Sequence, residues 1–202
     1  MLLFVGLGNP TRDSENNRHN IGFKMIDAIN QKFSLSKQKP KFKGLLTTGS
    51  VNKKKVYAIK PLTFMNNSGI CIREIIEYFK INAENVFVFH DDLDIDFGKV
   101  KAKFGGSSAG HNGIESIDKF IGKDYSRIRI GIGKPKSKDV VIDHVLKDFD
   151  EDEKIELEKI IVNIIDSIPI LLDKKLDLFS STVNNKWALN VELLVYPMLV
   201  NL

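Results

Sequence analysis

The chain has 202 residues, of which 43% are hydrophobic and 28% charged, and its formal net charge is +4 at pH 7. This length and composition predict one ordinary globular domain and exclude a disordered chain, a collagen-like fibre and a simple coiled coil. The one cysteine, Cys71, excludes an intrachain disulfide and a zinc site built from cysteines. The apolar runs are too short to span a bilayer, and the N-terminus lacks the basic flank of a signal peptide. We therefore predict a cytoplasmic protein with no membrane contact.

The charge is unevenly distributed along the chain. Residues 1–60 carry 12 Lys and Arg against 3 Asp and Glu, a balance of +9, whereas residues 136–202 carry 8 against 13, a balance of −5. Such asymmetry favours a basic face that binds a polyanion. The alternative is a set of solvated lysines with no nucleic-acid partner.

Strands and helices alternate along the first half of the chain. Apolar runs bounded by polar or glycine-containing segments indicate strands, and apolar residues at helical spacing indicate helices. In chain order, we predict a buried strand over 2–5, a polar loop over 11–18, a helix from about Asn20, a basic connector over 37–43, a hairpin of strands over 45–51 and 56–59, and a helix carrying the apolar stripe of Ile72, Ile75, Ile76 and Phe79.

The second half repeats this alternation. Lys99, Lys101 and Lys103 alternate with apolar residues, which predicts a strand with one basic face. Around it we predict a strand over 86–89 that runs into His90-Asp91-Asp92, a small-residue loop over 105–110, a helix from near Asn112, a strand over 127–132 and a long helix over 155–172 entered through the acidic run 148–153. The pattern predicts a single α/β domain, with a mixed, twisted β-sheet and helices on both faces.

Four polar clusters stand where predicted strands end or helices begin. They are Asn9 with Arg18-His19-Asn20, Phe64-Met65-Asn66-Asn67, His90-Asp91-Asp92 and Gly110-His111-Asn112-Gly113. Ligands of α/β sheets bind outside the carboxyl ends of the strands, so these clusters are expected to converge on one crevice.

The residue types in these clusters suit the hydrolysis of an ester. A histidine with an aspartate partner is the minimum for general-base activation of water, and asparagine amides can donate hydrogen bonds to a developing oxyanion. The alternative is that Asn66 and Asn112 are only helix caps. Other chemistries lack their motifs in this sequence. Gly6-x-Gly8 has no third glycine, which a dinucleotide-binding fingerprint needs, and no Gly-x-Ser-x-Gly motif is present to carry a serine nucleophile. No pair of histidines has metal-ligand spacing, so we expect no cofactor and no metal.

Six longer motifs contain these clusters. They are Gly6-Leu7-Gly8-Asn9-Pro10, Arg18-His19-Asn20-x-Gly22, Lys60-Pro61-x-Thr63-Phe64-Met65-Asn66-x-Ser68-Gly69, His90-Asp91-Asp92-Leu93-Asp94, Gly110-His111-Asn112-Gly113 and Arg127-Ile128-Arg129-Ile130-Gly131-Ile132-Gly133. In order and spacing they resemble the bacterial-type peptidyl-tRNA hydrolase family over about residues 2–187. Enzymes of that family cleave the ester between a peptide and the 3′ ribose of tRNA, which recycles tRNA from peptidyl-tRNA that ribosomes release prematurely.

The resemblance implies a role for each matched residue. His19 is similar to the general base that activates water, and Asp91 to the carboxylate that orients it. Asn9, Asn66 and Asn112 resemble amides that position the peptide, the water and the ester carbonyl, and Met65 resembles an apolar wall of the peptide channel. Lys101, Lys103 and Arg129 match basic positions of tRNA contact, whereas His111 is expected to be structural. The implied enzyme is a monomer whose partner is tRNA.

Two regions depart from the family pattern. Thr11, Ser14 and Asn17 replace the usual Gly, Tyr and Thr between Asn9 and His19, which affects the local wall of the site but not the base. Residues 188–202 have no clear counterpart and form an apolar extension, expected either to pack on the body or to bind a partner or another copy of the chain. A non-catalytic RNA-binding protein on the same scaffold is the leading alternative function. A nucleotide-binding protein is a third, but no acidic residue after the second strand suits a ribose.

Overall fold

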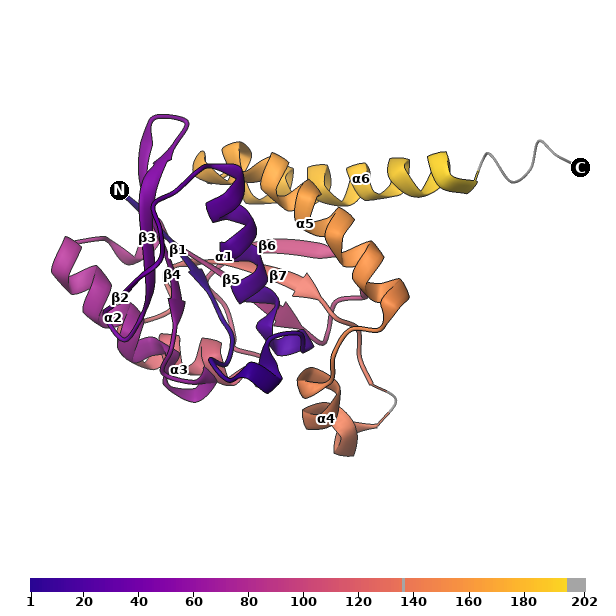
Figure 1. The fold of residues 1–202 in the computed structure, drawn as a ribbon, viewed down its shortest axis with the longest axis horizontal. Coiled ribbons are helices and arrows are strands. Elements are labelled where there is room, and N and C mark those ends of the chain that lie inside the picture. The colour runs from indigo at the N-terminus through magenta and orange to yellow at the C-terminus, as the bar shows by residue number, and fades with distance from the viewer. Residues whose placement is uncertain (136, 196–202) are drawn as a thin grey trace, which may run out of the picture.

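The structure is a computed structural model that describes residues 1–135 and 137–195, with side chains through Asn185 apart from that of Lys138 (Figure 1). The strands are β1 Leu2–Gly6, β2 Lys39–Lys41, β3 Gly44–Val51, β4 Lys54–Pro61, β5 Val86–Asp92, β6 Val100–Phe104 and β7 Ser126–Gly131. The α-helices are α1 Ile21–Lys32, α2 Ser68–Phe79, α3 Asn112–Ile121, α4 Val141–Leu146, α5 Glu151–Leu172 and α6 Leu176–Val195. Short 3-10 helices are η1 Arg12–Ser14, η2 Arg18–Asn20, η3 Met65–Asn67, η4 Ala83–Asn85 and η5 Lys138–Val140.

The described strands form one mixed seven-stranded sheet in the order β2-β3-β4-β1-β5-β7-β6. In its centre β4, β1, β5 and β7 run parallel, whereas β2, β3 and β6 pair antiparallel with their neighbours. The carboxyl ends of the four parallel strands therefore meet at one edge of the sheet. The segments that follow β1 and β4, and the end of β5 itself, carry three of the polar clusters, so the topology brings these three to the same edge. The fourth cluster, Gly110-His111-Asn112-Gly113, follows the antiparallel strand β6, and the chain returns to this edge before α3, where His111 contacts Asp91.

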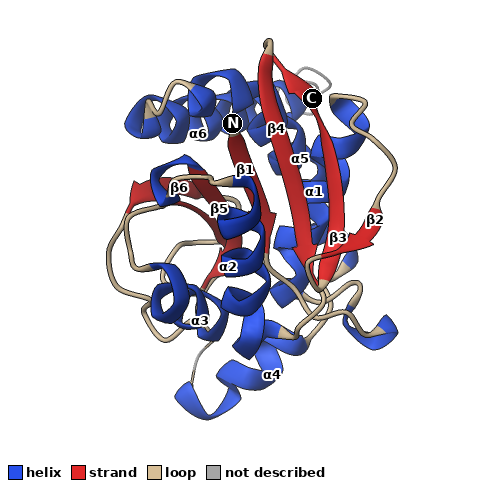
Figure 2. Cartoon of the chain, turned by 90° about the vertical axis from the view of Figure 1, so that its left-hand side faces the viewer, coloured by secondary structure: helices blue, strands red, loops and turns tan. Residues whose placement is uncertain are grey.

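Helices cover both faces of the sheet, as the sequence predicts (Figure 2). On one face, Phe4, Phe87 and Phe89 of the strands are fully buried against α1, α5 and α6. On the other face, Val5 and Val88 are buried against α2 and α3. Because the central strands are apolar on both faces, the polar residues at their ends are the exception and stand at a site rather than in the core.

Four segments differ from the sequence prediction. The basic connector over 37–43 contains the edge strand β2, whose Lys39 pairs with Leu46 of β3. The predicted loop over 11–18 forms η1 and begins η2. Two helices were not predicted, the six-residue α4 and the long α6.

Helix α6 covers the outer edge of β6 with polar side chains. Asn184 accepts a hydrogen bond from the Val100 N–H at 3.0 Å and donates one to the Val100 carbonyl at 2.9 Å, and Ser180 accepts one from the Ala102 N–H at 2.8 Å. An unpaired strand edge is a template for pairing with another chain, so these contacts protect it. None of the described helices has the length and apolarity that crossing a bilayer requires.

The predicted extension 188–202 begins inside α6. Residues 196–202 lie outside the described residues, as do the side chains of 186–195. The division of the chain at residue 187 therefore stays a prediction.

The contact between β1 and α1 is a close approach of two backbones. A Cβ atom on Gly22 would lie 2.3 Å from the Leu7 nitrogen and 2.4 Å from the Phe89 carbonyl oxygen, and one on Gly6 would lie 2.1 Å from the Gly22 oxygen. Real Cβ atoms do not approach backbone this closely. The glycines thus fix the height of α1, and of η2 just before it, above β1 and β5.

Replacing Gly22 with alanine tests this contact. We expect Gly22→Ala to lower the free energy of unfolding by about 1–3 kcal/mol or more, because the added methyl group must push α1 off the sheet. Gln31→Ala, an exposed change on the same helix, is the matched control and is expected to stay within about 0.5 kcal/mol of the wild type. Urea denaturation of the three proteins measures the difference, and equal midpoints would contradict the close contact.

Candidate active site

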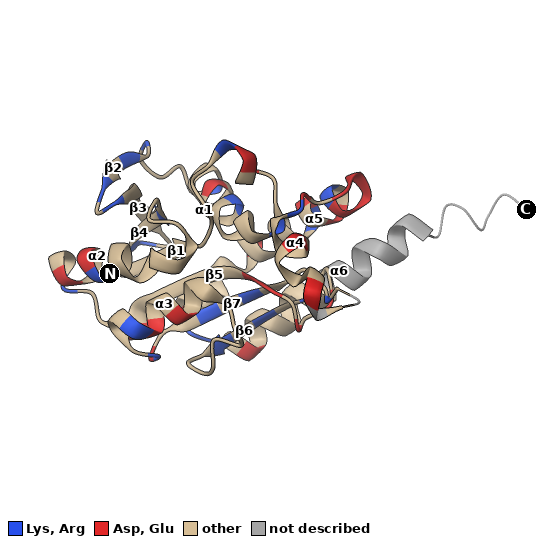
Figure 3. Cartoon of the chain, turned by 90° about the horizontal axis from the view of Figure 1, so that it is seen from below, with Lys and Arg blue, Asp and Glu red and all other residues tan. Residues whose placement is uncertain are grey.

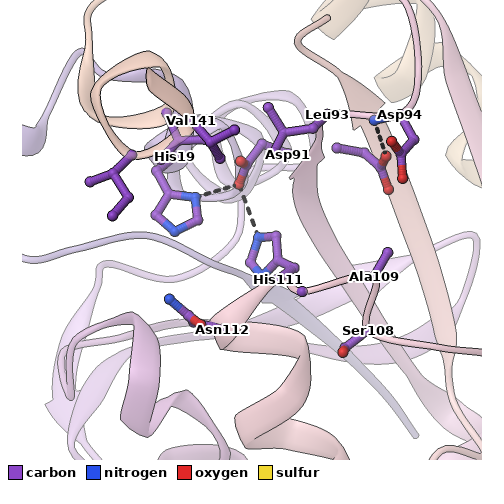
Figure 4. A pocket seen from close by; sticks show the side chains of 13 residues that line it. His19, Asp91, Leu93, Asp94, Ser108, Ala109, His111, Asn112 and Val141 are labelled. Carbon is purple, nitrogen blue, oxygen red and sulfur yellow. Dashed lines mark hydrogen bonds and ion pairs between the residues drawn. The ribbon is translucent and has the colours of Figure 1, made fainter. Parts of the chain in front are cut away.

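A histidine and an aspartate from distant parts of the chain meet at the carboxyl edge of the sheet. His19 stands on η2, between β1 and α1, and Asp91 is the second-last residue of the strand β5 (Figure 4). Nδ1 of His19 lies 2.8 Å from Oδ1 of Asp91. A carboxylate only accepts hydrogen bonds, so Nδ1 carries the hydrogen and Nε2 is the ring nitrogen left to take a proton.

A second histidine shares the same carboxylate oxygen. Nε2 of His111 lies 3.0 Å from Oδ1 of Asp91. Its Nδ1 is the N-cap of α3 and accepts hydrogen bonds from the Gly113 and Ile114 N–H groups at 3.1 and 3.3 Å. Backbone N–H groups only donate, so Nδ1 holds the lone pair and Nε2 donates to Asp91. His111 therefore fixes Asp91 to the start of α3.

The two rings determine the charge of Asp91, which is 2% exposed. Burial alone would raise the pKa of the Asp91 carboxyl, but the nearby imidazoles of His19 and His111, and their hydrogen bonds, outweigh burial and hold that pKa well below its ordinary value. Beside it, His90 donates a hydrogen bond from Nδ1 to the Asp91 carbonyl at 2.7 Å. Burial, reinforced by the neighbouring His111, lowers the pKa of His90 well below its ordinary value, so this ring stays neutral.

A cavity of about 170 Å³ opens onto the His19–Asp91 pair. The loop before α3 and the side chain of Asn112 form one side, and Val141, Ile142 and Val145 of α4 form an apolar side (Figure 4). The sequence interpretation missed this apolar side because it did not predict α4. The available signal was the apolar run Val140-Val141-Ile142 with Val145 one turn further on, which has helical spacing.

Asn9 joins two of the loops at this edge. Its Oδ1 accepts a hydrogen bond from the Met65 N–H at 2.9 Å. Its own N–H donates to Oδ1 of Asn20 at 2.8 Å, and its carbonyl accepts from Nδ2 of Asn20 at 2.9 Å. Asn9 itself lines a neighbouring cavity with Asn20 and Lys60. The structure therefore brings it to the edge of the site but not into the cavity of the His19–Asp91 pair, which we call the dyad.

Asn66 and Asn112 line a shared groove between η3 and α3, together with Asn67 and Ser116. Asn112 also lines the cavity of the dyad and thus connects the two spaces. The N-cap of α2 is Asn67 and that of α3 is His111, so neither Asn66 nor Asn112 is a helix cap. Met65 is 4% exposed and packs in the apolar core beneath the groove, where it contributes support more than open surface.

The predicted basic residues lie on the far side of β5 from His19. Lys101 and Lys103 are exposed on β6 and alternate with the buried Val100 and Ala102, as predicted. Lysine and arginine positions lie on both β6 and β7 (Figure 3). In the register of the sheet, Lys101 pairs with Arg129 of β7, and Arg129 lies next to His90 of β5. The Arg129 guanidinium is held 2.7 Å from Oδ2 of Asp92. The basic strip of Lys101, Lys103 and Arg129 therefore begins beside the dyad and runs to the sheet edge.

His19, Asp91 and His111 are also a group that is close enough to hold a metal ion, since their ligand atoms lie within 4.8 Å of one another. The helix cap argues against that use in this arrangement. A histidine ligates through a lone pair, and the cap gives the lone pair of His111 to α3 and the hydrogen to Nε2. The three residues fit a hydrogen-bonded triad better than a metal centre.

Known proteins with similar sequences and structures are peptidyl-tRNA hydrolases. The family model described as peptidyl-tRNA hydrolase matches residues 3–190. The peptidyl-tRNA hydrolase of Pelagibacter ubique is 86% identical over 186 residues, which cover 92% of this chain and 100% of that protein. That of Bartonella henselae is 45% identical over 91% of this chain and 95% of its own. The crystal structure of the Acinetobacter baumannii enzyme superposes with a TM-score of 0.86 at 31% identity, covering 91% of this chain and 94% of that one.

Proposed function

The chain belongs to the peptidyl-tRNA hydrolase family, and we propose that His19 is the general base of its reaction. The activity is that of a carboxylic ester hydrolase on peptidyl-tRNA. Water adds to the ester carbonyl, the bond from that carbon to the ribose oxygen breaks, and the products are a peptide with a free carboxyl group and a tRNA with a free 3′ ribose hydroxyl.

The 2.8 Å contact between His19 and Asp91 is the observation that carries this proposal. Nε2 of His19 takes a proton from the attacking water and later returns it to the leaving ribose oxygen. The imidazolium formed in between lies against Asp91, whose low pKa keeps it ionised and able to stabilise the positive ring. A non-catalytic RNA-binding protein should have lost at least one member of the polar set. The intact set and the close His19–Asp91 pair argue against this alternative; the set is Asn9, His19, Asn66, Asp91 and Asn112.

The asparagines supply polar groups that carry no charge. We assign Asn112, which lines both the cavity and the groove, to the ester carbonyl, and Asn66 to the peptide in the groove. Amide donors aimed at the carbonyl oxygen stabilise the oxyanion that forms on it. Asn9 positions the substrate with its amide and holds the Met65 loop. Met65 supports the peptide channel from below.

The basic strip of Lys101, Lys103 and Arg129 is proposed to contact tRNA phosphates. Lys101 and Lys103 are solvent-exposed, and the strip leads from the dyad to the edge of the sheet. Phosphate contacts position a nucleic acid without reading its sequence. A tRNA whose 3′ end enters the cavity would thus be held by charges outside it.

Removing the base tests the assignment of His19. We expect His19→Ala to lower single-turnover hydrolysis of peptidyl-tRNA by about 10²–10⁴-fold, the usual contribution of a general base. Binding of an amide-linked, uncleavable peptidyl-tRNA is expected to stay nearly unchanged, because the base acts on water. His144→Gln, which keeps a donor for the Ile132 carbonyl, is the matched control and keeps near-normal turnover. Turnover of His19→Ala close to the wild type would refute the assignment.

Salt dependence tests the basic strip. The double variant Lys101→Ala/Lys103→Ala should bind full-length tRNA more weakly. The negative slope of log K against log salt should become shallower by roughly one unit per lost phosphate contact. Hydrolysis of a peptide esterified to a short 3′ fragment should be almost unchanged, because that substrate does not reach the strip. Lys39→Ala on the opposite edge strand β2 is the control. An unchanged slope in the double variant means that these lysines are merely solvated.

A further inference from the structure

Arg18 precedes the base in sequence, yet its side chain is 5% exposed and binds a different part of the fold. Nη1 donates hydrogen bonds to the carbonyls of Lys147 and Asp148, at 3.1 and 2.8 Å, and Nη2 lies 2.5 Å from Oε2 of Glu153. The guanidinium carbon stands 5.2 Å from the centre of the Phe149 ring. Every one of these partners belongs to the connection between α4 and α5 or to the first turn of α5.

The main chain beside Arg18 is fixed to the same connection. The Arg18 N–H donates to the Lys147 carbonyl at 3.1 Å, and Asn17 forms an isolated β-bridge with Asp148. On the other side of His19, the Asn20 side chain is bound to both backbone groups of Asn9. The base therefore stands between two residues that are each held by another segment, Arg18 by the α4–α5 connection and Asn20 by the loop after β1, and these contacts restrain the short helix η2.

The far end of this contact is rigid. Glu153 is the third residue of α5 and part of a capping box with Asp150, whose N–H donates to Oε2 of Glu153 at 2.9 Å. One carboxylate oxygen thus serves both the helix cap and Arg18. Because α5 is a 22-residue helix packed in the core, it gives Arg18 a fixed anchor.

The same connection also ends α4, the helix whose Val141, Ile142 and Val145 form the apolar side of the cavity. The start of α1 and the α4–α5 connection lie side by side in the fold (Figure 1). A shift of residues 147–148 would therefore move the ring of His19 and the opposing wall relative to each other.

We propose that Arg18 is a positioning residue. It holds the His19 ring in place relative to Asp91 and to the apolar side of the cavity that α4 forms. The proposal rests on His19 being the base. A buried ion pair such as Arg18–Glu153 is weak support for stability by itself, since an apolar pair of similar volume often does as well. What the guanidinium adds is its planar fork, which reaches two carbonyls and one carboxylate at once, and lysine cannot reproduce that.

The test compares Arg18→Lys with Arg73→Lys, which alters an exposed arginine paired with Glu77 on α2. Turnover, KM and the pH–rate profile are measured on full-length protein, and urea denaturation gives the folded fraction. For Arg18→Lys we expect kcat per folded molecule to fall by about 10–100-fold, the usual effect of a misplaced reacting group. KM is expected to stay near the wild-type value, and the acid limb of the kcat profile to move to lower pH, because the ring lies farther from Asp91. Arg73→Lys should change none of these.

A second variant keeps the test decisive if Arg18→Lys does not fold. Glu153→Gln retains an oxygen for the capping box but removes the charge that holds Nη2, and we expect a smaller fall in kcat with the same shift of the acid limb. Normal kcat and an unshifted profile in the folded variants, with only a lower unfolding midpoint, would overturn the proposal. That result is separable from failure of the base assignment, because near-normal turnover of His19→Ala would refute His19 whatever Arg18 does.

Discussion

One carboxylate oxygen, Oδ1 of Asp91, receives hydrogen bonds from His19 at 2.8 Å and from His111 at 3.0 Å. The two rings differ in what else they bind. The second nitrogen of His111 caps α3, so that ring is committed to the fold, whereas His19 keeps its Nε2 for chemistry. Burial alone would raise the pKa of Asp91, and the two donors outweigh burial and hold that pKa below its ordinary value. The asymmetry between the two histidines therefore decides which of them can take the proton from water.

This arrangement requires three segments to lie together, namely the end of β5, η2 and the start of α3. A different feature of the fold holds each segment in place. The topology sets Asp91 at the end of a central parallel strand. The backbone contact of Gly6 with Gly22 sets the height of η2, and the Arg18 contacts set its direction. The cap of α3 sets His111. Apart from the cap, which is local to the start of α3, these contacts join different elements of the fold, so the site forms only with the complete sheet and its helices.

The sequence predicted the sheet and the edge at which the polar clusters meet, because those follow from local patterns. A buried apolar run that ends in His90-Asp91-Asp92 identifies β5 and its polar end without knowledge of any partner. The pattern failed where an element depends on the partner it packs against rather than on its own residues. Lys39-Pro40-Lys41 is polar and becomes a strand only beside β3, and α6 carries Ser180 and Asn184 at positions that bind the edge of β6. The anchor of Arg18 lies about 130 residues along the chain, beyond any periodicity.

The pH dependence of turnover in Asp91→Asn tests the central claim most directly, because it asks whether the carboxylate acts on the base. An aspartate beside an imidazole favours the protonated ring, and asparagine of the same shape does not. The account predicts a lower kcat and an acid limb of the kcat profile that moves to lower pH, since the base then loses its proton more readily. Binding of uncleavable peptidyl-tRNA should remain close to that of the wild type. An acid limb that stays in place, or moves to higher pH, would contradict the pairing of His19 with Asp91 as the catalytic unit.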